Sequence, residues 1–457
     1  MIFLILVIVA IVLYVWGYKI PALLLFFFFL TSGYNLFNKD MTEIGFISKG
    51  SDLAFFVLMG IITIAGCTQK KYFQIDLFTI FLIIFGLFLG AAVFNSKFII
   101  GLSWSEILRA CRSQFFWLVY FIFRSMEKEQ LEKLMRYLFD ITVFLSVLFI
   151  LQIIFKTRIL GGMDCYHIRI FGIVFPRFYN QPDMLHFFAI MAVYRNPYQG
   201  KWKIITTIIL VSALLGAFHR NLVGLFILVL IIGYTLKLSR LRRVIFMSAL
   251  GVALVGVFTL VGSQFMRSKT YADLQYVMGG DFAEVSEIDL ESFYKSTFTF
   301  RLAHLFERNQ YLVEHPKAML FGAGLLTEDS KMVDKLFDFK IGLLDESTQA
   351  RAQLDTSDIS YSLLIIRFGY LGTVLYFLLF FYLMFFFYKN KQNHPYAVFP
   401  FLYCVLVFGT SFFSASLIYP ITYVMMLMSY VIIQKTNGEK NNQIAKTEFE
   451  IISINEK

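Results

Sequence analysis

Charged residues are scarce in this sequence. Of its 457 residues, only 16% are Asp, Glu, Lys or Arg, whereas 58% are hydrophobic, and the mean hydropathy is +0.69. A chain of this composition cannot bury its apolar surface in one water-soluble core. Apolar runs close to the ~20 residues that cross a bilayer recur along most of its length. The composition excludes an ordinary soluble enzyme and predicts an integral membrane protein.

Cysteines and ligand motifs are also sparse. The four cysteines, Cys67, Cys111, Cys165 and Cys404, show neither metal-type spacing nor obvious disulfide pairs. The sequence contains no Gly-rich phosphate loop, no His-Glu-x-x-His, no Cys-x-x-Cys and no Asp-x-Asp of the kind that often holds a metal in nucleotide-sugar transferases. We therefore expect no nucleotide or metal cofactor.

Few ionisable residues fall in the middle of the apolar segments, where transporters and pumps usually need them. The sequence also shows no convincing inverted repeat of the kind found in transporter folds. Both observations count against a carrier.

The apolar segments predict an all-α polytopic membrane protein. We expect about 12–14 transmembrane helices and one large external loop that contains short helices. The expected spans are 2–17, 20–35, 52–67, 75–94, 112–124, 137–155, 183–195, 203–217, 221–236, 243–262, 359–388, 396–412 and 415–434. The first is interpreted as a retained helix, because it lacks a basic flank and a small-residue cleavage site.

These spans divide the chain into four parts. Residues 1–262 form an N-terminal helix bundle, 263–358 the large loop, 359–434 the C-terminal helices and 435–457 a polar tail.

The distribution of Lys and Arg predicts the orientation. Basic residues gather beside alternate helix ends: Lys70 with Lys71, the run 124–136, residues 195–203, 237–243, Lys389 with Lys391, and the tail. This side is expected to be cytoplasmic, which leaves the large loop outside. Residues 264–356 hold 10 Lys plus Arg and 15 Asp plus Glu, a net charge of −5, so the rest carries +15 of the total of +10. The basic excess is a topology signal and does not indicate nucleic acid.

Arginines on the outward side break this rule. In the connection 167–185, Arg169 and Arg177 flank an apolar dip, and the Asn-Gln-Pro run at 180–182 indicates a turn before the next helix. By residue type alone, this is a re-entrant or interfacial loop whose arginines reach lipid headgroups.

A second outward arginine lies in the short link 216–224. Arg220 stands at an expected helix start, where backbone N–H groups favour anions. Its simpler role is an interfacial anchor.

The large loop contains a predicted amphipathic helix that begins near Phe298. Arg301, His304 and Arg308 follow at i, i+3 and i+7 and therefore share one stripe. Such a stripe is most often a solvated face. Pro316 is expected to end the helix, and the glycines at 322 and 324 allow a tight turn.

The loop ends at a further carboxylate. Asp358 stands at the mouth of the next expected helix, where it is partly desolvated yet reachable from outside. The alternative role is an N-cap together with Ser357.

Together these motifs resemble the bacterial polymerases and ligases of lipid-linked polysaccharides, the Wzy and O-antigen ligase superfamily. The order from Arg169 to the Asn-x-Pro turn resembles the family's Arg-x-x-Gly…Asn-Pro pattern. The turn around Arg220 resembles a Ser-Arg-Gly-like turn, with His219 and Asn221 in place of serine and glycine.

The loop carries the longer match. Arg301, His315-Pro316 and Gly322-x-Gly324 resemble the family's Arg…His-Pro-x-x-x-x-x-Gly-x-Gly signature. Asp358 with Tyr361, followed by Gly369 and Gly372, resembles the polymerases more than the lipid A-core ligases, in which this junction begins with His.

The resemblance implies a metal-independent glycosyltransferase of the inner membrane that joins undecaprenyl-pyrophosphate-linked oligosaccharide repeat units into O-antigen or capsule. In that reading Arg169, Arg220 and Arg301 hold the departing pyrophosphate. Asp358 accepts the proton of the acceptor hydroxyl, with His304 or His315 as substitutes. Arg177, Arg308 and Tyr361 are expected to contact substrate. A chain-length regulator and a flippase are further expected partners, besides membrane lipids.

Two other functions remain open. A ligase would transfer finished polymer to another acceptor. A flippase or transporter would depend on intramembrane polar residues such as Asn95 or Asp140.

Overall fold

The computed structural model describes most of the chain outside the large loop. The described residues are 2–36, 50–68, 73, 75–161, 165–170, 173–239, 241–242, 245–246, 248, 297–328, 330, 332–342, 351–354 and 359–455. Asp358 and most of the expected span 243–262 lie outside them.

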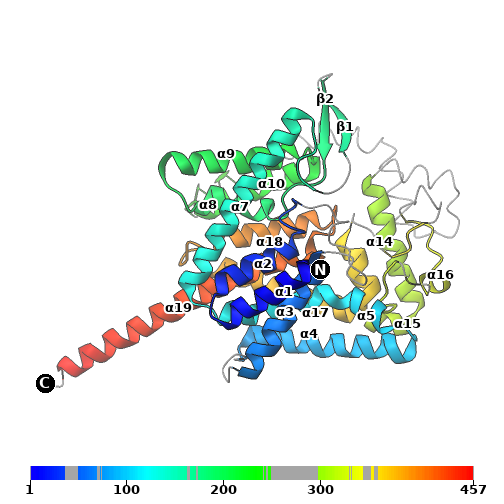
Figure 1. The fold of residues 1–457 in the computed structure, drawn as a ribbon, viewed down its shortest axis with the longest axis horizontal. Helices are drawn as coiled ribbons and strands as arrows, with labels where there is room; N and C mark the ends of the chain where they lie inside the picture. The colour runs from blue at the N-terminus through cyan, green and yellow to red at the C-terminus, as the bar shows by residue number, and fades with distance from the viewer. Residues whose placement is uncertain are drawn as a thin grey trace.

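The described chain is mostly helical (Figure 1). Its α-helices are α1 Ile2–Val15, α2 Lys19–Leu30, α3 Gly50–Thr68, α4 Leu77–Phe94, α5 Trp104–Cys111, α6 Val119–Arg124, α7 Lys128–Phe155, α8 Leu185–Arg195, α9 Gly200–Gly216, α10 Arg220–Lys237, α14 Thr297–Glu314, α15 Pro316–Phe321, α16 Val333–Leu336, α17 Ser360–Asn390, α18 Val398–Thr410 and α19 Pro420–Asn455. Shorter turns are the π-helix η2 Asn95–Ile99 and the 3-10 helices η3 Arg112–Leu118 and η5 Ser416–Ile418.

Local sequence fixes several helix boundaries. The Asp76 side chain caps α4 by accepting from the backbone N–H of Thr79 at 2.8 Å. Ser103 and Glu106 form a capping box at the start of α5. As expected, the loop helix α14 ends before Pro316, which takes the first position of α15.

The helices have the two-faced character expected in lipid. On α4, Phe78, Leu82 and Phe85 are buried, whereas Ile83 and Leu87 are 48% and 71% exposed. Exposure of such apolar side chains to water is unfavourable, whereas contact with lipid tails is not. The fold class is therefore confirmed as helical, and its surface suits a membrane.

Four described helices are long and apolar enough to cross a membrane: Gly50–Thr68, Leu77–Ile99, Lys128–Phe155 and Ser360–Asn390. Shorter apolar helices are Ile2–Val15, Lys19–Leu30, Leu185–Arg195, Asn221–Lys237 and Val398–Thr410. Each expected span other than 243–262 coincides with helical structure, although 112–124 is divided between η3 and α6.

The connection 167–185 differs from the all-helical expectation, because it contains an antiparallel hairpin, β1 Cys165–Ile170 and β2 Ile173–Phe178. Its alternating aromatic and β-branched residues favour a strand. The polar tail is helical, since α19 continues as one helix to Asn455 and projects from the body (Figure 1).

One end of the bundle gathers the basic residues, and we call it the basic end. Lys19 donates to the backbone oxygen of Ser125 at 2.6 Å. Asp76 accepts from the Tyr120 hydroxyl at 2.5 Å and the Gln434 amide at 3.2 Å. These contacts join the starts of α2 and α4, the end of α6 and the middle of α19.

More of the basic residues meet at the same end. Lys128, at the start of α7, pairs with Glu439 of α19 at 2.9 Å. Asn437 of α19 donates to Asn390, the last residue of α17, at 3.0 Å. These contacts bring the start of α7, the end of α17 and the middle of α19 together at the basic end.

The described part of the large loop forms a small folded body on α14. Arg308 is fully buried and donates to Glu307 at 2.6 Å and to the backbone oxygens of Ile341 and Gln353. Glu307 also accepts from the backbone N–H groups of Lys340 and Ile341. Burial raises the pKa of Glu307 above its ordinary value, although Arg308 partly offsets that effect.

Candidate functional site

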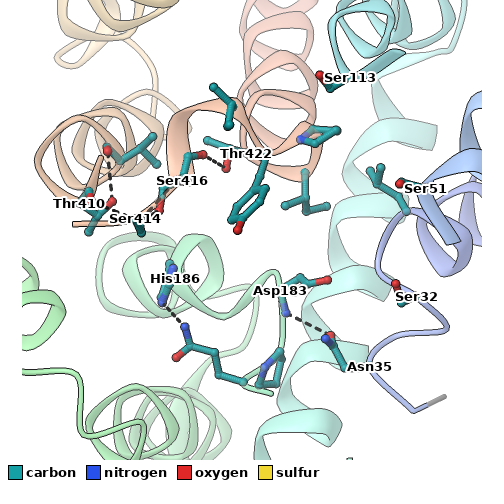
Figure 2. A pocket seen from close by; sticks show the side chains of 18 of the residues that line it. Ser32, Asn35, Ser51, Ser113, Asp183, His186, Thr410, Ser414, Ser416 and Thr422 are labelled. Atoms are coloured by element: carbon teal, nitrogen blue, oxygen red, sulfur yellow. Dashed lines mark hydrogen bonds between the residues drawn. The ribbon is translucent and has the colours of Figure 1, made fainter. Parts of the chain in front are cut away.

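A cavity of about 600 Å³ lies at the bundle end opposite the basic end. Helix ends and the segments between them line it (Figure 2), in the order of the chain: Leu30, Ser32, Asn35, Gly50, Ser51, Arg109, Arg112, Ser113, Tyr179–Asp183, His186, His219, Asn221, Arg367, Tyr403, Thr410, Phe413, Ser414, Ser416 and Tyr419–Thr422. Its volume is in the range typical of small-molecule sites.

Helix polarity makes this cavity attractive to anions. The helices α3, α8, α10 and α19 all begin at its wall, with Gly50, His186, Asn221 and Pro420 among the lining residues. Among the described helices whose ends line the cavity, α2, α5 and α18 have their C-terminal ends there. The N-terminal end of a helix carries a partial positive charge and unsatisfied N–H donors.

Side-chain charges add to the same field. Three arginines line the cavity, Arg109, Arg112 and Arg367. Among its described lining residues, Asp183 is the single carboxylate. Arg112 forms an ion pair with Asp52, which is 5% exposed. This buried carboxylate fixes the position of the Arg112 guanidinium at the cavity wall. The charge balance of the lining is therefore positive.

The segment before α8 is held rigidly at the cavity. Asn180 is buried and exchanges hydrogen bonds with Gln152 of α7, and it also donates to the backbone oxygen of Leu160 at 2.7 Å. The backbone N–H of Asp183 donates to the Asn35 side chain at 3.2 Å (Figure 2). The turn predicted at 180–182 is present, since Leu185 N–H bonds back to the Pro182 oxygen.

A hydroxyl-rich turn closes the cavity between α18 and α19. Ser360, the first residue of α17, donates to the Ser414 backbone oxygen at 2.9 Å and accepts from the Leu417 N–H. Thr422 donates to the Ser416 oxygen at 2.8 Å (Figure 2). The start of α17 is thereby fixed to this turn, immediately after the region of Asp358, which lies outside the described residues.

A kink in α17 accompanies Arg367. Gly369 has φ +64°, which interrupts the helix, and the backbone oxygen of Ile366 instead accepts from the Ala323 N–H at 2.8 Å. A Cβ on Gly322 would lie 2.3 Å from the Arg367 oxygen. The Gly-x-Gly turn of the loop thus fits against the kink because it lacks side chains there, and the two together fix the backbone at Arg367.

The expected arginines fall in different places. The guanidinium of Arg301 lies 5.6 Å from the ring centre of Phe413, a lining residue. That of Arg177 lies 4.7 Å from the ring centre of Tyr179, another lining residue. Arg220 begins α10 between His219 and Asn221, both at the wall. These three positions border the cavity.

The hairpin does not place Arg169 and Arg177 on the same face. The register pairs Arg169 with Val174 and Tyr166 with Arg177. Because cross-strand partners share a face and faces alternate along a strand, positions 169 and 177 belong to opposite faces.

The stripe on α14 faces the protein instead of solvent. Arg301, His304 and Arg308 are 9%, 1% and 0% exposed. The His304 Nδ1 hydrogen-bonds the Ser362 hydroxyl at 2.6 Å, and burial lowers the pKa of His304 well below its ordinary value. Of the three, only Arg301 approaches the cavity lining described above.

Two other expected residues make contacts away from the lining. His315 stacks on Tyr311 with 4.2 Å between ring centres and hydrogen-bonds the Tyr311 oxygen at 2.8 Å. The Tyr361 hydroxyl donates to the backbone oxygen of Phe408 at 2.7 Å, which ties α17 to α18.

Several cavity residues carry no motif that marks them in the sequence. These residues are Arg109, Arg112, Asp183, His186 and Arg367, and all line the wall. Arg367 lies inside the expected span 359–388. Arg109 precedes the expected span 112–124 on its outward side, and Arg112 begins it. Both patterns are costly in a membrane and favour a functional role.

Comparison with known proteins adds no relative. No protein-family model matches this chain, and no curated protein matches it. Within the described residues, no group of three or more His, Cys, Asp or Glu side chains is arranged to hold a metal ion.

Proposed function

We propose that this protein is a polysaccharide polymerase that joins undecaprenyl-pyrophosphate-linked repeat units on the outer face of the plasma membrane. The observation that carries the proposal is the arginine-lined cavity at the bundle end opposite the basic end. By the positive-inside rule the basic end is cytoplasmic, so the cavity opens outward.

The cavity suits a pyrophosphate group joined to a lipid. A pyrophosphate has several acceptor oxygens, and guanidinium groups bind such oxygens in pairs. Arg109, Arg112 and Arg367 line the wall, and Arg301 borders it. Four helix N-termini contribute further positive potential. Arg220 joins this set in the proposal through its place at the start of α10.

The cations would act on the leaving group. Negative charge grows on the pyrophosphate as its bond to the sugar breaks, so fixed cations stabilise the transition state more than the bound substrate. The hydroxyl and amide side chains of the wall, such as Ser414, Thr422 and Asn35, suit sugar hydroxyls. No nucleotide is needed, because the lipid pyrophosphate is already an activated donor.

The decisive experiment is a chain-length analysis of lipid-linked glycan in cells that lack the gene. We expect single lipid-linked repeat units to accumulate on the outer face and long chains to disappear. Re-expression of the full chain should restore the ladder of chain lengths.

Other outcomes would overturn the proposal. Lipid-linked long chains in the deletion would identify a ligase. Repeat units confined to the inner face would identify a flippase. An unchanged ladder would exclude all three activities.

A further inference from the structure

Asp183 is the feature of the cavity that anion binding does not explain. It is the single carboxylate among the described lining residues, and it shares the wall with three arginines. A carboxylate repels a bound pyrophosphate, so a site built only to hold anions gains nothing from it.

The position of Asp183 is well defined. Its backbone N–H bonds Asn35, and the preceding turn is fixed through Asn180 to Gln152 and Leu160. Figure 2 shows Asp183 between Asn35 and His186. The carboxylate is exposed to the cavity and held on a rigid segment, as a proton acceptor requires.

The histidines expected as alternative bases are placed differently. His304 is buried against Ser362, and His315 stacks on Tyr311. Neither belongs to the cavity lining. His186 does, and its ring nitrogen is engaged with Gln181 at 3.3 Å.

We propose that Asp183 is the general base of the transfer, an inference that rests on the proposed function. Its carboxylate takes the proton of the acceptor sugar hydroxyl as that oxygen bonds to the anomeric carbon of the donor. The bond between the anomeric carbon and the phosphate oxygen breaks, and its electron pair leaves with undecaprenyl pyrophosphate against the arginines. The proton on Asp183 then passes to water, which restores the carboxylate.

The test uses the full chain in lipid nanodiscs, with lipid-linked repeat units extracted from the deletion strain as substrate. Asp183→Asn should lower the rate of chain growth by about 10²–10⁴-fold, the range for loss of a general base. The same variant should bind undecaprenyl pyrophosphate as tightly as the wild type or more tightly, because a repelling charge is gone. Asp338→Asn, an exposed carboxylate of the large loop, is the matched control and should retain full activity.

The outcomes separate the inference from the function on which it rests. A wild-type protein that forms no chains overturns the proposed function. An active wild type with an equally active Asp183→Asn variant overturns the general base alone. Equal loss of binding and turnover would mean that Asp183 only shapes the cavity.

A second pair of variants covers the case in which Asp183→Asn does not accumulate. Asp183→Glu keeps a carboxylate. Asp183→Gln introduces a side chain of the same size as Glu but without the carboxylate. Chain growth by the Glu variant and not by the Gln variant supports the general base, and equal activity of the two contradicts it.

Discussion

The two ends of the helix bundle carry cations in opposite circumstances. At the basic end, Arg124 pairs with Asp76 and Lys128 with Glu439, and hydrogen bonds join the helices between them. At the cavity end, three arginines share a hollow of about 600 Å³ with one carboxylate of the wall. The cations of the basic end join neighbouring helices, whereas the arginines of the cavity end also line a space large enough for a ligand.

Substitution of arginines at the two ends should give the largest contrast. Arg367→Ala should lower the rate of chain growth by about 10²–10³-fold, as expected when a preorganised donor to a developing charge is removed. Arg136→Ala removes an exposed arginine near the basic end and should change the rate by less than about threefold. The measurement is the initial rate of chain growth by purified protein. Equal losses from both variants would remove the distinction between the ends.

Asp76 tests the structural role of the basic end. Asp76→Ala removes the α4 cap and leaves the buried Tyr120 hydroxyl without its acceptor, so the loss of stability should be about 2 kcal/mol. The rate of chain growth per folded molecule should not change. Unfolding temperature in detergent is the readout, and Glu439→Gln, which breaks an exposed pair, should cost less than about 1 kcal/mol. A slower reaction in Asp76→Ala at unchanged stability would contradict this assignment.

The smallest expected effect is the pH dependence of the stability that Asp76 contributes at the basic end. Burial alone would raise the pKa of Asp76, but hydrogen bonds from Tyr120, Thr79 and Gln434 together hold it below its ordinary value. A carboxylate with a lowered folded-state pKa stabilises the fold above its unfolded pKa, near ~4, and loses that contribution as the pH falls through the folded value. The difference in unfolding temperature between wild type and Asp76→Asn should therefore shrink below about pH 4. A difference that stays constant with pH would mean that the carboxylate charge is not involved.

The helices were predictable because they depend on local pattern. Apolar runs located the helices, and Pro316 and the glycines at 322 and 324 marked the breaks in the loop. The hairpin at 165–178 was not expected, since a short apolar run fits a strand as well as an interfacial loop.

The site was less predictable because it depends on contacts between distant segments. Arg112 and Arg367 meet one cavity from positions more than two hundred residues apart, and only the packed bundle brings them together. The α14 stripe had the periodicity of a solvated face, yet Arg308 is buried by Glu307 and by two backbone oxygens of the loop. Periodicity identifies the face of a helix but not what covers it.

The central claim is that the cavity end holds the pyrophosphate of the lipid donor. Determination of the structure of the full chain with undecaprenyl pyrophosphate in nanodiscs tests it most directly. The account predicts phosphate density within hydrogen-bonding distance of Arg367 and Arg112, at the starts of α8 and α10. Phosphate density at the basic end, beside Lys19 and Arg124, with the cavity empty would contradict it.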